Sequence, residues 1–128
     1  MEEFEVAESY NKLCEDIINH TPDLEFIRSE GLHVCVLLSN KQKKSQGKTV
    51  FAECIRMNDL QFFLTRYHFV IVVYEPNAMF MDDEQIRILL THELMHIGVK
   101  NGKTCIIPHD VEDFRAIIDE FGIDWSVI

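Results

Sequence analysis

The pattern of hydrophobic and polar residues predicts a helix followed by three short strands. Residues 2 to 20 carry apolar side chains at helical spacing up to Thr21-Pro22, so we expect an amphipathic helix there. Its apolar stripe would be Phe4, Tyr10, Leu13, Cys14, Ile17 and Ile18. A further helical turn is expected around Leu24 to Ile27. The strands are expected at Leu32 to Leu38, Thr49 to Met57 and His68 to Tyr74.

The third of these strands differs from the others because Phe69 to Val73 are all apolar. A run without alternation predicts a strand that is covered on both faces. The segment Ser39 to Lys48 holds four of the twelve basic residues and is predicted to be a hairpin connection with its tip in solvent. A cationic tip could also contact an acidic partner. Asn58 to Tyr67 fits either a short helix or a strand.

A second helix is predicted from Asp82 to Gly98. Asp82 is a good N-cap, and Gln85 three residues later completes a capping-box pattern. Gly98 would permit the left-handed turn that ends a helix. The core stripe is expected to be Ile86, Leu90, Leu94 and Ile97.

The end of the chain is predicted to form a loop and a last helix. Val99 to Ile107 is expected to be a loop with a turn at Asn101-Gly102. Pro108 opens the next helix, whose first turn is acidic and whose far end is Gly122. The whole pattern predicts an α+β fold with a small sheet of three or slightly more strands. At 128 residues, we expect residues 1–128 to form a single domain.

Composition and charge exclude some classes of protein. Apolar residues make up 47% and charged residues 27%, as in ordinary globular proteins. The net charge of −10 repels phosphate backbones, so nucleic-acid binding is not expected. No run is long enough to span a membrane and the amino terminus is acidic, so we expect a cytoplasmic protein. The four cysteines form no C-x-x-C pair, and we expect reduced thiols, with Cys35 and Cys54 in the core.

The residues of chemical interest are His92-Glu93-Leu94-Met95-His96, which read H-E-x-x-H. Positions four apart share one face of a helix, so both imidazoles could reach one metal ion. These side chains lie at the edge of the core stripe, where they would face a cleft. Glu93 stands where a general base for a metal-activated water is needed. The alternative for such a spacing is a surface His pair, or polar residues that close off a core, but the intervening Glu, the core stripe and the capped helix ends favour the metal site.

Catalytic zinc usually has three protein ligands, so a third donor must come from elsewhere. We expect His109, because it stands at the entrance of the last helix after a loop that is long enough to fold back. Cys105 is the second choice, and Asp110 or Asp113 are weaker ones. A second oxyanion donor is also expected, with Tyr67, Tyr74 and His68 as candidates.

The segments HELMHIG and PHDVEDF resemble the paired segments of zincin metallopeptidases of the SprT-like and phage metallopeptidase families. This resemblance is specific from Asp82 to Phe121. It implies a compact zincin-like fold with Zn²⁺ held by His92, His96 and His109, and with Glu93 as the catalytic base. The chain departs from metzincins, because Gly98 falls one residue early, and it lacks the downstream Glu ligand segment of gluzincins.

Three functional hypotheses follow. The main one is a zinc-dependent metallopeptidase that hydrolyses protein or peptide substrates. The second is a non-catalytic zinc-containing zincin module of phage or mobile-element origin that acts through protein contacts. The third is a zinc hydrolase of another amide or ester. The sequence predicts no oligomeric state.

Overall fold

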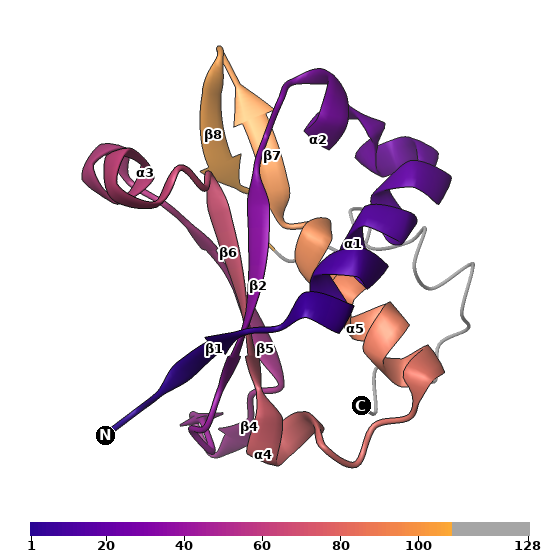
Figure 1. The fold of residues 1–128 in the computed structure, drawn as a ribbon, viewed down its shortest axis with the longest axis vertical. Coiled ribbons are helices and arrows are strands. Elements are labelled where there is room, and N and C mark those ends of the chain that lie inside the picture. The colour runs from indigo at the N-terminus through magenta and orange to yellow at the C-terminus, as the bar shows by residue number, and fades with distance from the viewer. Residues whose placement is uncertain (109–128) are drawn as a thin grey trace.

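The fold is centred on a four-stranded sheet in the order β1-β2-β6-β5 (Figure 1). The structure is a computed structural model, and it describes residues 1–108. Strand β2 (Val34–Ser39) runs parallel to β6 (Phe69–Tyr74). Strand β5 (Ala52–Arg56) pairs antiparallel with the other side of β6, and β1 (Phe4–Val6) pairs antiparallel with β2. Strand β5 therefore forms one edge of the sheet.

Every residue of β6 is buried, which confirms the prediction of a strand covered on both faces. Phe69, Ile71 and Val73 belong to the main core, on the side of the helices. Val70, Val72 and Tyr74 form a second cluster on the opposite face. Because successive side chains of a strand point to opposite faces, an unbroken apolar run suits only a strand with two apolar faces.

The helical segments between β1 and β2 in the chain lie on one side of the sheet (Figure 1). Helix α1 (Glu8–His20) contributes the buried Cys14 and Ile17. It is followed by the 3-10 helix η1 (Pro22–Leu24) and by α2 (Glu25–Ser29). Arg87 of helix α5 (Asp83–Leu94) donates to Asp16 of α1 at 2.9 Å, which joins the two long helices.

The first helix is shorter than the sequence predicts. Residues 4–6 form β1, and Phe4 is 54% exposed instead of belonging to the helix stripe. Phe4 and Val6 also fit the two-residue period of a strand, and pairing with β2 supplies main-chain hydrogen bonds that only the tertiary fold provides. The predicted stop at Pro22 is confirmed, since α1 ends at His20.

The connection from β2 to β5 contains a small two-stranded ribbon. It consists of β3 (Lys44–Ser45) and β4 (Lys48–Thr49), and both strands are exposed, as expected for a hairpin tip in solvent. However, β2 and β5 do not pair with each other, because β6 lies between them. The predicted hairpin is therefore local to the tip and does not join neighbouring strands of the main sheet.

The ambiguous segment after β5 is a helix. Helix α3 (Asp59–Thr65) begins with a capping box in which Asn58 and Gln61 exchange hydrogen bonds, and it has no buried residue. A short helix α4 (Glu75–Ala78) follows β6.

Helix α5 (Asp83–Leu94) begins as predicted. The Asp82 side chain accepts from the Gln85 N–H at 2.8 Å, and the Gln85 side chain accepts from the Asp82 N–H at 3.0 Å. The predicted core stripe is confirmed for Ile86, Leu90 and Leu94, which are buried on the helix, whereas Ile97 is buried as part of a strand. The predicted end at Gly98 is wrong, because the helix ends at Leu94 and Gly98 does not have a positive φ.

The segment predicted to be a loop is a β-hairpin. Strands β7 (Ile97–Lys100) and β8 (Lys103–Ile106) pair antiparallel. The predicted turn at Asn101-Gly102 is confirmed, with φ of 53° and 74°. Two successive positive φ values suit the tight turn between two strands, and Asn-Gly between apolar residues is a strong hairpin signal. The predicted last helix lies outside the described residues, apart from Pro108.

The structure confirms the α+β class of the fold. Within residues 1–108, no helix is long and apolar enough to cross a membrane.

Candidate active site

The three polar residues of the H-E-x-x-H motif lie around the carboxyl end of α5. His92 and Glu93 belong to its last turn, and His96 follows on the turn that leads into β7. This turn is tighter than an α-helix, because the His96 N–H donates to the Glu93 carbonyl three residues back. The ring centroids of His92 and His96 are 5.1 Å apart and the rings are nearly perpendicular. The spacing thus brings the two imidazoles together although the helix ends before His96.

All three side chains are buried, with exposed fractions of 6% for His92, 5% for Glu93 and 6% for His96. Buried polar side chains are costly unless they are paired or bound to a metal. A dry environment also strengthens every electrostatic interaction inside it.

The ring of His96 is oriented by the residue after β8. Its Nδ1 lies 2.6 Å from the carbonyl oxygen of Ile107, and the Ile107 N–H donates to the His96 carbonyl at 2.7 Å. A carbonyl oxygen can only accept, so Nδ1 must carry the proton, and the lone pair of the neutral ring then lies on Nε2. A histidine that binds metal commonly donates its other ring N–H to such an oxygen, which fixes both tautomer and orientation.

Gly98 makes this arrangement possible. A Cβ atom at position 98 would lie 2.8 Å from Cδ1 and Cγ1 of Ile107 and 3.1 Å from Sγ of Cys105. The absence of a side chain therefore lets the end of the hairpin lie against β7. This role of the hairpin was not predicted from the sequence, although Asn101-Gly102 between two strand-like runs was a signal for it.

Glu93 faces strand β5. Its carboxylate is hydrogen-bonded to the backbone of Cys54. Burial raises the pKa of Glu93 to about 8, and the nearby charge of Glu53 also raises it, while the Cys54 hydrogen bond opposes both effects. Glu93 is thus a buried carboxyl group that favours its protonated form when no cation lies beside it.

The hydrogen bonds of the sheet show which backbone groups of β5 face outward. Met57 N–H donates to the His68 carbonyl, and Phe51 accepts from the Tyr74 N–H, each at 2.9 Å. In an antiparallel pair such bonds alternate, so the N–H and C=O of Ala52, Cys54 and Arg56 point away from β6, toward the outer edge of the sheet. The Cys54 N–H that bonds to Glu93 is therefore one of the outward-facing groups, and Glu93 lies directly beside the edge of the sheet.

Two cysteines near Glu93 are held as thiols. Burial raises the pKa of Cys14 to about 12. The pKa of Cys54 is also raised, first by burial and then by the charges of Glu93 and Cys14. Metal binding requires the thiolate form of cysteine, so the raised pKa values of Cys14 and Cys54 disfavour these side chains as metal ligands.

The described residues bring together two of the three expected ligands. Among residues 1–108, no group of three His, Cys, Asp or Glu side chains could hold a metal ion, so Cys105 on β8 does not complete the pair. His109 lies outside the described residues, as do Asp110 and Asp113. Ile107, which precedes His109 by two positions in the sequence, is hydrogen-bonded to the His96 ring. The described part of the site thus supplies two adjacent imidazoles, one of them oriented through its Nδ1–H, and imidazole is a donor type that zinc accepts.

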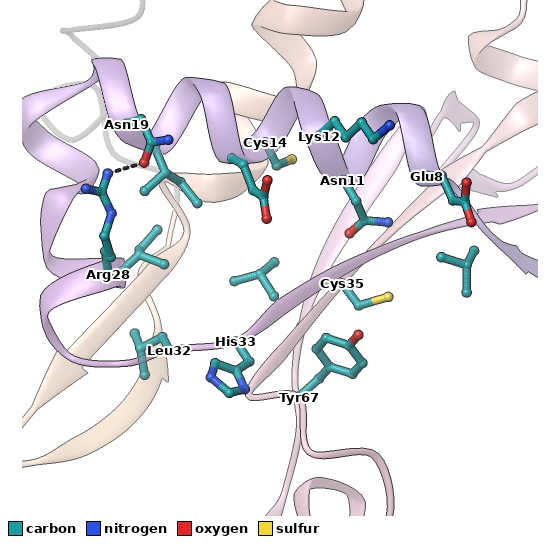
Figure 2. Close-up of a pocket in the computed structure, with 15 residues that line it drawn as sticks. Glu8, Asn11, Lys12, Cys14, Asn19, Arg28, Leu32, His33, Cys35 and Tyr67 are labelled. Carbon is teal, nitrogen blue, oxygen red and sulfur yellow. Dashed lines mark hydrogen bonds between the residues drawn. The ribbon is translucent and has the colours of Figure 1, made fainter.

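The candidate oxyanion donors lie in different surroundings. The Tyr74 hydroxyl donates to Glu53 at 2.9 Å, and Nδ1 of His68 accepts from the His33 N–H at 2.9 Å. Tyr67 lines a cavity of about 1010 Å³ between α1 and the start of β2, where it lies beside Cys35 (Figure 2). None of the three motif residues lines this cavity. The cleft that the sequence predicts at the motif is thus not this cavity.

Comparison with known families assigns the chain. A family model described as "Putative phage metallopeptidase" matches residues 2–128. The chain belongs to this phage metallopeptidase family. Membership in a metallopeptidase family implies a metal cofactor. No curated protein and no solved structure gives a significant match.

Proposed function

We propose that this member of the phage metallopeptidase family is a zinc-dependent peptidase with a zincin-like fold. The observation that carries the proposal is the placement of Glu93, which lies next to a pair of adjacent histidines and is hydrogen-bonded to the edge strand β5. The ligands in this proposal are His92, His96 and His109. Zinc, when bound, lowers the pKa of a coordinated water to about 7 and polarises the carbonyl group of the substrate.

The residues of the chain have separate roles in this proposal. His92 and His96 bind the metal, and the Ile107 carbonyl keeps the proton of His96 on Nδ1. Glu93 acts as general base: it accepts a proton from the attacking water and delivers it to the leaving amine. Its burial raises its pKa, whereas a cation bound beside it would lower this pKa by favouring the carboxylate. A cation bound there would therefore favour the carboxylate form that a general base needs.

The edge of β5 provides a place for the substrate. Outward-facing N–H and C=O groups at Ala52 and Arg56 can pair with the main chain of an extended peptide. Because Cys54 lies between them and contacts Glu93, a peptide bound there would pass directly by the general base. Main-chain pairing of this kind suits a peptide and offers little to small esters or amides.

The test is the variant Glu93→Gln, which keeps the shape of the side chain and removes the base. We expect it to bind one zinc per chain, as measured by atomic absorption, and to lose at least about 100-fold in kcat on a peptide library. Glu84→Gln, at an exposed position of the same helix, is the control and should keep full activity. Cleavage by Glu93→Gln at the wild-type rate would refute the role of Glu93. Stoichiometric zinc without cleavage by the wild type would favour a binding module.

A further inference from the structure

Positive charge is concentrated around the edge strand beside the site. Residues 40–66 and 97–107 contain eight Lys and Arg residues and two Asp and Glu residues, whereas the other described residues contain three and fourteen. These two segments comprise β3, β4, β5, α3 and the β7–β8 hairpin. Of the eight cations, Lys43 forms an ion pair, with Glu53, and no other ion pair of this group occurs among residues 1–108. A protein with a net charge of −10 thus has a cationic region that its own acidic residues do not neutralise.

Four of the eight cations, Arg56, Arg66, Lys100 and Lys103, lie in β5, at the end of α3 and in the β7–β8 hairpin rather than in the β3–β4 ribbon. Arg56 donates through Nε to the carbonyl and hydroxyl oxygens of Thr104, at 2.8 and 2.9 Å, and so joins β5 to β8. Next to Thr104, Lys103 lies directly opposite Lys100 in the hairpin, and both are exposed. Like charges directly opposite each other in an antiparallel pair are destabilising. An anionic ligand would remove this repulsion.

An exposed apolar helix lies beside the Arg56 end of β5. Helix α3 begins three residues after Arg56 and stands out from the body of the molecule on the side of the β7–β8 hairpin (Figure 1). Leu60, Phe63 and Leu64 are exposed by 66%, 65% and 70%, and the helix buries no residue of its own. The Arg66 guanidinium lies 5.5 Å from the Phe63 ring centroid, so positive charge and apolar surface are adjacent. Large exposed apolar patches with polar rims mark interaction sites.

We propose that this surface, formed by the exposed side of α3 with Arg56, Arg66, Lys100 and Lys103, binds acidic polypeptide segments that carry bulky apolar residues. The inference rests on the proposed function, since it names such segments as the substrate class of the peptidase. Charge complementarity selects the acidic residues, and α3 holds the apolar side chains. A polypeptide fits better than a nucleic acid, because only a polypeptide can also pair with the outward N–H and C=O groups of β5.

The test measures binding separately from cleavage. The full chain with Glu93→Gln is titrated with a fluorescein-labelled 12-residue peptide of Asp, Glu, Leu and Phe, and binding is followed by fluorescence anisotropy. We expect a matched peptide with Asn and Gln in place of the acidic residues to bind at least tenfold more weakly. The substitutions Lys100→Glu with Lys103→Glu should weaken binding of the acidic peptide at least tenfold. The control Lys12→Glu with Arg28→Glu makes the same change of charge on α1 and α2. Its affinity for the acidic peptide should stay within twofold of that of the protein without these substitutions.

A second variant keeps the inference testable if charge reversal disturbs the hairpin. Phe63→Ser with Leu64→Ser changes exposed side chains only, and it should weaken binding of the acidic peptide at least fivefold while leaving the circular dichroism unchanged. Unchanged affinity in both surface variants would overturn the inference. So would tighter binding of a single-stranded oligonucleotide of equal charge.

The outcomes separate this inference from the proposed function. If the acidic peptide binds as expected but wild-type protein with zinc never cleaves it, the peptidase assignment fails and the docking surface stands. If the wild type cleaves neutral and acidic peptides with equal kcat/KM and the surface variants cleave normally, the docking surface fails and the peptidase stands.

Discussion

At the scale of single residues, the motif supplied the chemistry and its neighbours supplied the geometry. H-E-x-x-H was readable from the sequence, and the structure places His92, Glu93 and His96 together in a buried setting. The partners of these side chains were not readable. Cys54 is 39 positions before Glu93, and the Ile107 carbonyl reaches His96 only because a hairpin turns between them. Gly98, expected to end a helix, instead allows the two strands of that hairpin to approach.

The first prediction concerns Gly98→Ala. The added Cβ would meet Ile107 at 2.8 Å, and relieving that contact should lower the free energy of unfolding by about 1–3 kcal/mol, as measured by urea denaturation. The double variant with Ile107→Ala should lose less stability than the sum of the two single variants, because the clashing atoms are absent. Simple additivity would show that the Ile107 contact is not the cause.

At the scale of elements, boundaries set by local hydrogen bonds or by proline were predicted, whereas boundaries set by strand pairing were not. The capping boxes of α3 and α5 are made by residues three positions apart, so the sequence contains all of their hydrogen bonds. The end of α5 depends on the pairing of β7 with β8 and on the hydrogen bonds between His96 and Ile107. These contacts lie outside the helix, so the helical pattern does not encode them. For the same reason, β1 was mistaken for the start of α1: its hydrogen-bond partner lies more than 30 residues away.

The second prediction concerns the cap of the active-site helix. Asp82→Ala removes the acceptor for the Gln85 N–H and should cost about 1 kcal/mol of stability in chemical denaturation. Asp83→Ala is the matched control, since it lies one position on without a cap bond, and it should cost less. Equal losses for the two variants would mean that the cap bond contributes nothing beyond the helix dipole.

At the scale of the whole molecule, strand order determines what lies beside the site. The insertion of β6 between β2 and β5 buries the most apolar strand in the centre and leaves β5 at an edge. That edge is where Glu93 makes its main-chain contact and where the cationic surface begins. The local sequence pattern would also fit a hairpin in which β2 pairs with β5. In that sheet β5 would not be the strand beside β6 at the edge.

The third prediction concerns the metal. Zinc at 100 times its dissociation constant should stabilise the wild-type protein by about 2.7 kcal/mol, seen as a rise in the unfolding temperature that EDTA reverses. His92→Ala, His96→Ala and His109→Ala should each abolish this rise, whereas Cys105→Ala should retain it. His20→Ala, at an exposed position of α1, is the control. A rise retained in His109→Ala and lost in Cys105→Ala would reassign the third ligand to Cys105.

The sequence by itself determined the α+β class, the covered central strand, the capped start of α5, and a histidine pair with a carboxylate between them. These features depend on local hydrogen bonds or on short periodic patterns, and both are complete within a few residues. The tertiary structure alone decided that β5 is an edge strand, that Glu93 bonds to it, and that the residue after the β7–β8 hairpin orients His96. Those contacts join segments far apart in the chain or require a close approach of two backbones, and no local pattern encodes which segments will meet.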